Sequence, residues 1–214
     1  MESAQVAIVR DEEELFARTA HLFAAAADVA CAANDLNTWQ ANRTAADGVV
    51  PQHRTSVRVR KLYRPGVLLN PSTAQHLASL RQAGAEIRIT QDEVNETIIL
   101  DRRVAILAGD LSGGRRSYSV ISQAEVVQGV ASLFEAAWRS SVELAVYDAQ
   151  LAELRSLAPR VLELLATGGK DESAARALGL GVRTYRRRVA ELMAALGAES
   201  RFQAGVRARE LGLV

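Results

Sequence analysis

Residues 171–196, DESAARALGLGVRTYRRRVAELMAAL, carry the clearest structural signal in this chain. Residues 171–180 predict a short helix with Asp171 as its N-cap. Gly179 stands where that helix would end in the left-handed conformation, which glycine alone adopts without steric cost. A second helix is predicted over 182–196, because its apolar residues are spaced by four, three, one and three positions and so share one helix face. These apolar residues are Tyr185, Val189, Leu192, Met193 and Leu196.

The opposite face of the second helix presents Arg183, Arg186, Arg187 and Ala190. Arginine pairs bidentately with guanine edges and clamps phosphates, so a helix that is cationic on one side and packed on the other suits a DNA major groove. The alternative is that residues 186–188 form an ordinary solvated charged face. The preceding short helix and glycine turn, and the helix predicted after residue 197, favour the DNA-binding interpretation.

Residues from about Leu154 to Leu211 resemble the LuxR/GerE-type DNA-binding domain of bacterial transcription regulators. The resemblance covers a little over a quarter of the chain, and its spacing agrees across four expected helices. The matching residues are Val161, Leu162, Leu164, Leu165, Gly168, Ala175, Leu178, Gly179, Leu180, Thr184, Val189, Leu192, Leu196, Gly197, Ser200, Arg201, Phe202, Gln203 and Ala204.

This resemblance implies a role for each position on the second helix. The base-facing positions of the family fall on Arg186, Arg187 and Ala190, and the positions that hold backbone phosphate fall on Arg183 and Thr184. The last helix pairs two such domains in the family, which implies a homodimer on double-stranded DNA with half-sites about one turn, ~34 Å, apart. The predicted DNA-binding residues are Arg183, Thr184, Arg186, Arg187, Arg188 and Ala190.

The charge distribution supports a nucleic-acid partner. The net charge of the whole chain is only +1. Residues 155–214, however, contain 11 Arg and Lys against 6 Asp and Glu, a net charge of +5, which leaves −4 on the other 154 residues. The positive charge is therefore concentrated in the segment predicted to bind DNA, where it would release counterions from the phosphate backbone.

The first 150 residues alternate between helix and strand patterns, which predicts an α/β domain with a mixed sheet and flanking helices over residues 1–150. An all-α, four-helix domain with the helix-turn-helix is predicted over 151–214. The turn 101–103 makes 96–108 a hairpin candidate. Helices are expected at 10–27, 70–84 and 123–156, and strands at 28–34, 55–62, 85–90, 96–100, 104–108 and 117–121.

The α/β segment resembles the phospholipase D-like sensor domains of some regulators, including the TrmB-type effector domain. The resemblance rests on VRVRKLYRPGVL (57–68), GAEIRI (84–89), IILDRRVAILAG (98–109) and LFEAAW (133–138). The catalytic members of that superfamily need a His nucleophile and a phosphate-binding Lys upstream of an Asp. If Asp101 is that Asp, Val94 and Glu96 occupy the two positions, and neither can do the chemistry. We therefore expect no catalytic residues and no enzyme activity.

Polar residues that follow predicted strands form a candidate effector site: Asn34, Asp35, Tyr63 and Arg64. The alternative is that these are turn residues with no ligand. The single cysteine, Cys31, excludes an intrachain disulfide, and no histidine has partners at metal-ligand spacing, so no metal or cofactor is expected. No apolar run reaches the length of a membrane span and no signal peptide is recognisable, so we expect a cytoplasmic protein.

The sequence thus predicts a sequence-specific transcriptional regulator whose N-terminal domain senses a small-molecule effector, mediates dimerisation, or both. RNA polymerase is a candidate partner. Two alternatives remain at this stage: a protein–protein adaptor that uses the helical domain, and a phosphodiesterase-type enzyme, which the missing His and Lys disfavour.

Overall fold

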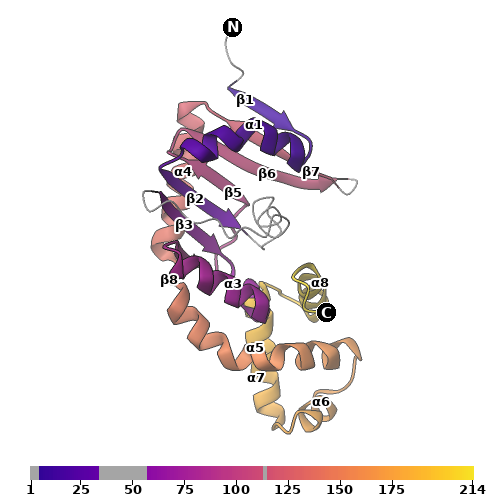
Figure 1. The fold of residues 1–214 in the computed structure, drawn as a ribbon. Coiled ribbons are helices and arrows are strands. Elements are labelled where there is room, and N and C mark those ends of the chain that lie inside the picture. The colour runs from indigo at the N-terminus through magenta and orange to yellow at the C-terminus, as the bar shows by residue number, and fades with distance from the viewer. Residues whose placement is uncertain (1–4, 34–56, 113–114) are drawn as a thin grey trace.

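The computed structural model describes residues 5–33, 57–112 and 115–214. Within these ranges an α/β part is followed by an all-helical part (Figure 1). The predicted mixed sheet with flanking helices and the all-helical C-terminal part are both confirmed.

The sheet has eight strands in the order β1-β7-β6-β5-β2-β3-β4-β8. The central strands β2, β3 and β4 run parallel, and all other neighbours are antiparallel. The predicted hairpin is the β5–β6 pair, whereas the edge strand β1 was not predicted. The strands are β1 (Val6–Val9), β2 (Asp28–Ala33), β3 (Arg58–Tyr63), β4 (Glu86–Ile89), β5 (Thr97–Leu100), β6 (Val104–Ser112), β7 (Arg115–Ile121) and β8 (Val142–Glu143).

Several helices begin and end where the sequence signals predict. The side chain of Asn70 accepts a hydrogen bond from the backbone N–H of Ser72 (3.0 Å) and so caps α3, which ends before Gly84 at φ +98°. The helices are α1 (Glu12–Ala25), the 3₁₀ helix η1 (Pro65–Leu69), α3 (Pro71–Gln82), α4 (Ala124–Ser140), α5 (Leu144–Ala166), α6 (Asp171–Ala177), α7 (Val182–Leu196) and α8 (Arg201–Glu210).

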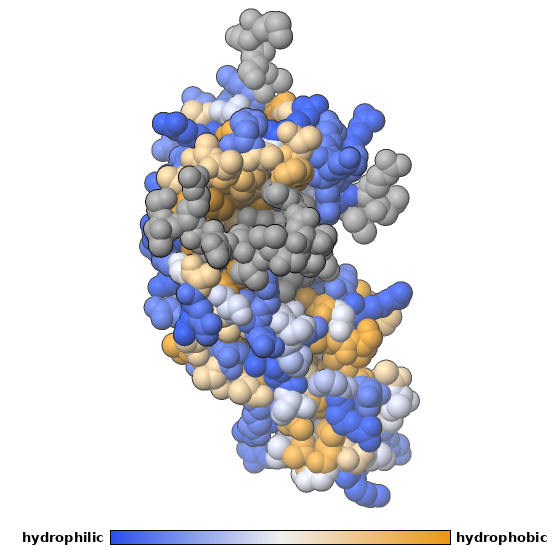
Figure 2. Space-filling model, viewed as in Figure 1, coloured by the Kyte–Doolittle hydropathy of each residue, from blue (hydrophilic) through white to orange (hydrophobic). Residues whose placement is uncertain are grey.

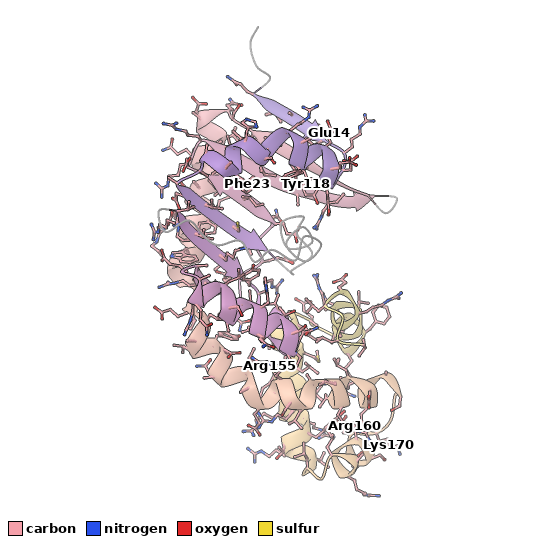
Figure 3. All side chains as sticks on the ribbon, viewed as in Figure 1. Glu14, Phe23, Tyr118, Arg155, Arg160 and Lys170 are labelled. Carbon is pink, nitrogen blue, oxygen red and sulfur yellow. The ribbon has the colours of Figure 1, made fainter. Side chains whose placement is uncertain are left out.

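Helices α1 and α4 cover opposite faces of the sheet (Figure 1). Alternate strand residues point to the two faces, so Ile99 packs under α4 while Ile98 and Leu100 belong to the core on the α1 side. Tyr118 of β7 donates its hydroxyl to Glu12 of α1 (3.3 Å), and burial raises the pKa of Tyr118 to about 12 (Figure 3).

A buried arginine lies between the sheet and α4. Arg60 of β3 is only 4% exposed and donates hydrogen bonds to Glu135 (2.8 Å) and Asp28 (3.2 Å). Its guanidinium carbon lies 5.3 Å from the ring centroid of Phe134 and 5.8 Å from that of Trp138. The bond from Arg60 keeps the pKa of Glu135 below its usual range. Ionic and cation–π contacts therefore hold α4 on this face.

The prediction of one continuous helix over 123–156 is wrong. Helix α4 ends at Ser140, and the chain forms the short strand β8 beside β4 before α5 begins. Arg88 of β4 donates hydrogen bonds to the carbonyl oxygens of Trp138 (3.1 Å) and Ser141 (3.4 Å) and lies over the Trp138 ring at 5.2 Å. These tertiary contacts use the last carbonyls of α4 and end a helix whose sequence pattern would allow it to continue.

The two parts of the chain meet at η1, which packs against both α5 and α7. A Cβ on Gly66 would lie 2.8 Å from Cδ1 of Leu211 and 3.3 Å from the carbonyl oxygen of Ala195, so the backbones of η1 and α7 approach closely here and a larger residue would require both contacts to shift. From α5, Arg155 donates to the carbonyl oxygen of Leu68 (Figure 3). Helix α5 runs through residue 150, and one hydrophobic core extends from the sheet into the C-terminal helices.

A second close approach occurs at the end of α7. Gly197 has φ +65°, and the guanidinium of Arg64 occupies the space that a Cβ on Gly197 would need. A cation at the C-terminal end of a helix also interacts favourably with the helix dipole. Arg64, which directly follows β3, therefore joins the sheet to α7.

Arg60→Ala should lower the free energy of unfolding by about 3 kcal/mol, because Asp28 and Glu135 would lose their buried partner. Arg58→Ala removes the same charge from the same strand, but Arg58 and Glu86 are both about half exposed, so it should cost less than about 1 kcal/mol. Urea unfolding of both variants measures the difference, and equal losses would contradict the assigned role of Arg60.

Gly197→Ala should lower the free energy of unfolding by about 2 kcal/mol, because alanine is strained at positive φ and its methyl group would displace Arg64. In an Arg64→Ala background the displacement vanishes and the loss should shrink. Gly169→Ala, where φ is not positive and a Cβ would meet only Oγ1 of Thr167 at 3.6 Å, is the control and should change stability little. Equal losses in the two backgrounds would show that Arg64 does not occupy this position.

Candidate nucleic-acid interface

Helices α6 and α7 are joined by a tight turn at Gly179, which adopts φ +66° as predicted. The backbone N–H of Leu180 donates to the carbonyl oxygen of Ala175 (2.9 Å), and that of Gly179 donates to Arg176 (3.1 Å). This is the hydrogen-bond pattern of a helix that ends in a left-handed residue. The turn fixes the direction in which α7 leaves α6.

One face of α7 is buried against the neighbouring helices. The range of α7 agrees with the predicted second helix, 182–196. Helix α7 contacts α5, α6, α8 and η1, so its orientation is set from several sides. The buried residues of this face are Tyr185, Val189, Leu192, Ala195 and Leu196.

The other face of α7 is exposed and cationic. Arg186 and Arg187 have side chains that are 60% and 63% exposed, and Arg183 and Ala190 are also exposed. Thr184 is half-buried at the edge of this face. Within the described ranges, Arg183 has no ion pair, so its guanidinium is available to an external anion. We call Arg183, Arg186, Arg187 and Ala190 the basic face of α7.

Asp171 binds an arginine of the basic face. The prediction that Asp171 is the N-cap of α6 is wrong. Lys170 precedes α6 as its N-cap residue, and no side chain caps the helix. The Asp171 carboxylate instead accepts from Arg186 of α7 (2.8 Å) and Arg201 of α8 (2.8 Å), two guanidinium donors that use both of its oxygens. These bonds, first that from Arg186, hold the pKa of Asp171 below its usual range. One carboxylate thus ties three helices together.

Arg188, which was predicted from the sequence to be one of the DNA-binding arginines, lies apart from the basic face. Its side chain is 12% exposed and forms ion pairs with Glu191 (2.8 Å) and with Glu153 of α5. Two residues after Arg186, a helical side chain is rotated by about 200° to the other side of the helix. Arg188 therefore links α7 to α5.

Three further exposed cations of the C-terminal helices were not predicted as site residues: Lys170 and Arg176 at the two ends of α6, and Arg201 at the start of α8. Figure 3 labels Lys170. Arg201 is joined to the basic face by Asp171, which also binds Arg186, and no periodic signal in the sequence relates α8 to α7. Figure 2 shows the surface of the C-terminal helices in this view as hydrophilic side chains with apolar patches between them.

Of the four predicted effector residues, the structure describes only Tyr63 and Arg64. Asn34 and Asp35 lie outside the described residues. Tyr63 is buried, and burial raises its pKa. Arg64 turns away from the sheet toward the end of α7 and lies 3.6 Å from Glu93. The structure therefore places Arg64 at the contact between the two parts of the chain.

The position that the phospholipase D-like resemblance aligns with a catalytic lysine holds a buried acid. Glu96 is 6% exposed, and its carboxylate forms an ion pair with Arg116 of β7. A carboxylate at this position repels a phosphodiester. Among the described residues, no group of three or more His, Cys, Asp and Glu side chains could hold a metal ion, and no helix is both long and apolar enough to cross a membrane.

Comparison with known proteins finds a regulatory relative. A Streptomyces hygroscopicus protein named as the bialaphos biosynthetic pathway regulatory protein is 32% identical over 160 residues, which cover 74% of this chain. The match covers 62% of that protein, so this chain spans less than two thirds of the curated relative. No protein-family model matches the chain.

The similarities to solved structures are distant. The archaeal chromatin protein TrmBL2, whose structure shows a novel mode of DNA binding, has a TM-score of 0.47 and 16% identity over 67% of this chain and 55% of that protein. NucT from Helicobacter pylori has a TM-score of 0.49 and 11% identity over 64% of this chain and 98% of that protein. Because these TM-scores lie below 0.5, neither likeness carries an argument about function.

The stability of the C-terminal helices should fall in acid in a way that depends on Asp171. Because its pKa is lowered by folding, its contribution is complete above the unfolded pKa, about 3.9, and is lost as the pH falls through the lower folded value. Asp171→Asn should therefore lower stability at pH 7 and flatten the dependence between about pH 5 and pH 2.

Glu172→Gln is the matched control, because Glu172 neighbours Asp171 on α6 but lies 3.8 Å from Arg186 and is mostly exposed. It should leave both the stability at pH 7 and the acid dependence nearly unchanged. Urea unfolding between pH 2 and pH 7 measures both variants. An unchanged acid dependence in Asp171→Asn would show that its carboxylate does not join these helices in solution.

Proposed function

We propose that this chain is a sequence-specific DNA-binding transcriptional regulator. In this proposal α6 and α7 form a helix-turn-helix, and α7 enters the major groove. The observation that carries the proposal is the basic face of α7, held outward by a fully packed opposite face. The name of the Streptomyces relative supports a regulatory role, and the resemblance of residues 154–211 to LuxR/GerE-type domains supports the mode of binding.

The contacts differ along the basic face. Arg186 and Arg187 would pair with base edges beside Ala190, while Arg183 and Thr184 would hold backbone phosphate at the start of α7. Arg188 is left out of this set because its side chain is only 12% exposed and faces α5, where it pairs with Glu153. The bond to Asp171 orients the Arg186 side chain before DNA binds. On binding, Arg186 would exchange this bond for one to DNA.

In this proposal the chain has two domains, residues 1–150 and 151–214, and the first serves effector sensing, dimerisation or both. A ligand that moved the end of β3 would act on Arg64, and through Arg64 on the end of α7. The protein would act as a homodimer on two half-sites, with RNA polymerase as a further partner. We do not propose phosphodiesterase activity, because the paired carboxylate of Glu96 stands at the position of the catalytic lysine.

An adaptor function is the second candidate. It is favoured by the exposed apolar residues of α8, where Phe202 is 84% exposed and Val206 is also exposed. In that case α8 would contact another protein, and the basic face would not determine binding to promoter DNA.

Arg186→Ala and Arg187→Ala should each weaken binding to the preferred DNA by about 5- to 150-fold, the range for one bidentate base contact, while Arg183→Ala should lower the salt dependence by about one phosphate contact. The DNA fragment is first selected by genome-wide mapping of the fragments that the protein retains. Fluorescence anisotropy at several salt concentrations then measures affinity and salt slope.

Arg18→Ala is the control, because it removes one exposed, ion-paired arginine from α1, far from α7 in the chain. It should leave specific DNA affinity nearly unchanged. Full DNA binding by folded Arg186→Ala and Arg187→Ala proteins would contradict the proposal and favour the adaptor function.

A further inference from the structure

The outer face of α4 is unusual for a helix that covers a sheet. Such helices normally place charged side chains toward solvent. Between Val126 and Trp138, however, the only charged residue is Glu135, which is turned inward onto Arg60 (2.8 Å). The solvent side of α4 therefore has no charge along most of its length.

The same face carries an apolar stripe. Val126, Gly129, Leu133 and Ala136 are all exposed and follow one another at spacings of three, four and three, which places them in one line along the helix. Leu133 is 74% exposed. Around Gly129, a Cβ would meet nothing within 4 Å, so the helix surface is open there. The exposed Leu133 side chain thus lies one helical turn from an open space at Gly129 that could accept a leucine side chain from another molecule.

We propose that this stripe of α4 binds the same stripe of a second copy of the chain, with the two α4 helices antiparallel. A two-fold axis at the level of Ala131 places Leu133 of each copy over Gly129 of the other and Val126 over Ala136. In a parallel pair each residue would instead face itself, so that two leucines would meet and the two glycines would leave a void. Antiparallel pairing also opposes the helix dipoles.

The ends of the stripe are complementary in charge. Glu125 precedes it and Arg139 follows it, both are exposed, and neither forms an ion pair with any other described residue. In the antiparallel register Glu125 of one copy lies at the level of residue 137 of the other, about 3 Å along the axis from Arg139. A parallel pair would place like charges together at both ends.

The size of the contact sets the expected strength. A helix of 17 residues is about 25 Å long, and one such pair buries less than the ~1,200–2,000 Å² of a stable interface. The dimer should therefore be weak and concentration-dependent in free solution. This inference deepens the proposed function, since it supplies the dimer contact of the N-terminal part, but it can be measured without DNA.

A charge swap tests the pairing directly. Sedimentation velocity of the full chain without DNA, from about 1 to 200 µM, should show a monomer–dimer equilibrium that Glu125→Arg and Arg139→Glu each weaken by about 5-fold or more. The double variant should restore it. Within one helix these residues are 14 positions, or about 21 Å, apart, so restoration can come only from contact between copies.

Leu133→Glu should abolish the dimer without unfolding the chain, because this side chain has few contacts to lose. Phe202→Glu is the matched control on α8 and should leave the DNA-free dimer intact. A monomer at all concentrations, loss of the dimer in Phe202→Glu but not in Leu133→Glu, or failure of the double charge variant to restore dimerisation would each overturn this inference. Binding of Leu133→Glu to a single half-site should persist, which separates this result from the test of DNA binding.

Discussion

The contact between η1 and the end of α7 is the constraint on which the rest of the structure depends. At Gly66 a Cβ would lie 3.3 Å from the carbonyl oxygen of Ala195, so the backbones of η1 and α7 are in close contact, and at Gly197 the guanidinium of Arg64 fills the space beside the helix end. A larger residue at Gly66 would shift the Leu211 side chain and this backbone contact, and one at Gly197 would displace Arg64. Either change would loosen one of the supports that fix the direction of α7.

Arg186 and Arg187 of α7 are paired with acids of the same chain in the absence of DNA. Asp171 positions Arg186, and Glu191 lies 3.7 Å from Arg187. Such exposed pairs are individually weak, so in the proposed function phosphate oxygens or guanine edges would replace the carboxylates at modest cost. These ion pairs already limit the conformations of the arginine side chains, so binding would cost less side-chain entropy. That favours a specific contact with fixed geometry over a diffuse electrostatic attraction.

The sequence alone predicts the elements whose signals are local. The glycine turn at 179, the cap at Asn70 and the whole of α7 follow from φ preferences, capping chemistry and a 3.6-residue period, and the structure agrees with each. It does not predict what distant residues decide. Arg88 ends α4 from 50 residues away, and Arg201 binds Asp171 and so leaves α6 without its expected cap. The inward position of Arg188 depends likewise on Glu153, on a different helix.

The single hydrophobic core that joins both parts of the chain has a thermodynamic consequence. Elements that share a core tend to melt as one cooperative unit, so the folding equilibria of the sheet and of the helical part are linked. If an effector bound the sheet and DNA bound α7, as the proposed function has it, any coupling between the two affinities would be the same in both directions, because binding free energies are reciprocal. A substitution that destabilises the sheet would therefore also lower the folded population of the helical part, without changing any residue of α7.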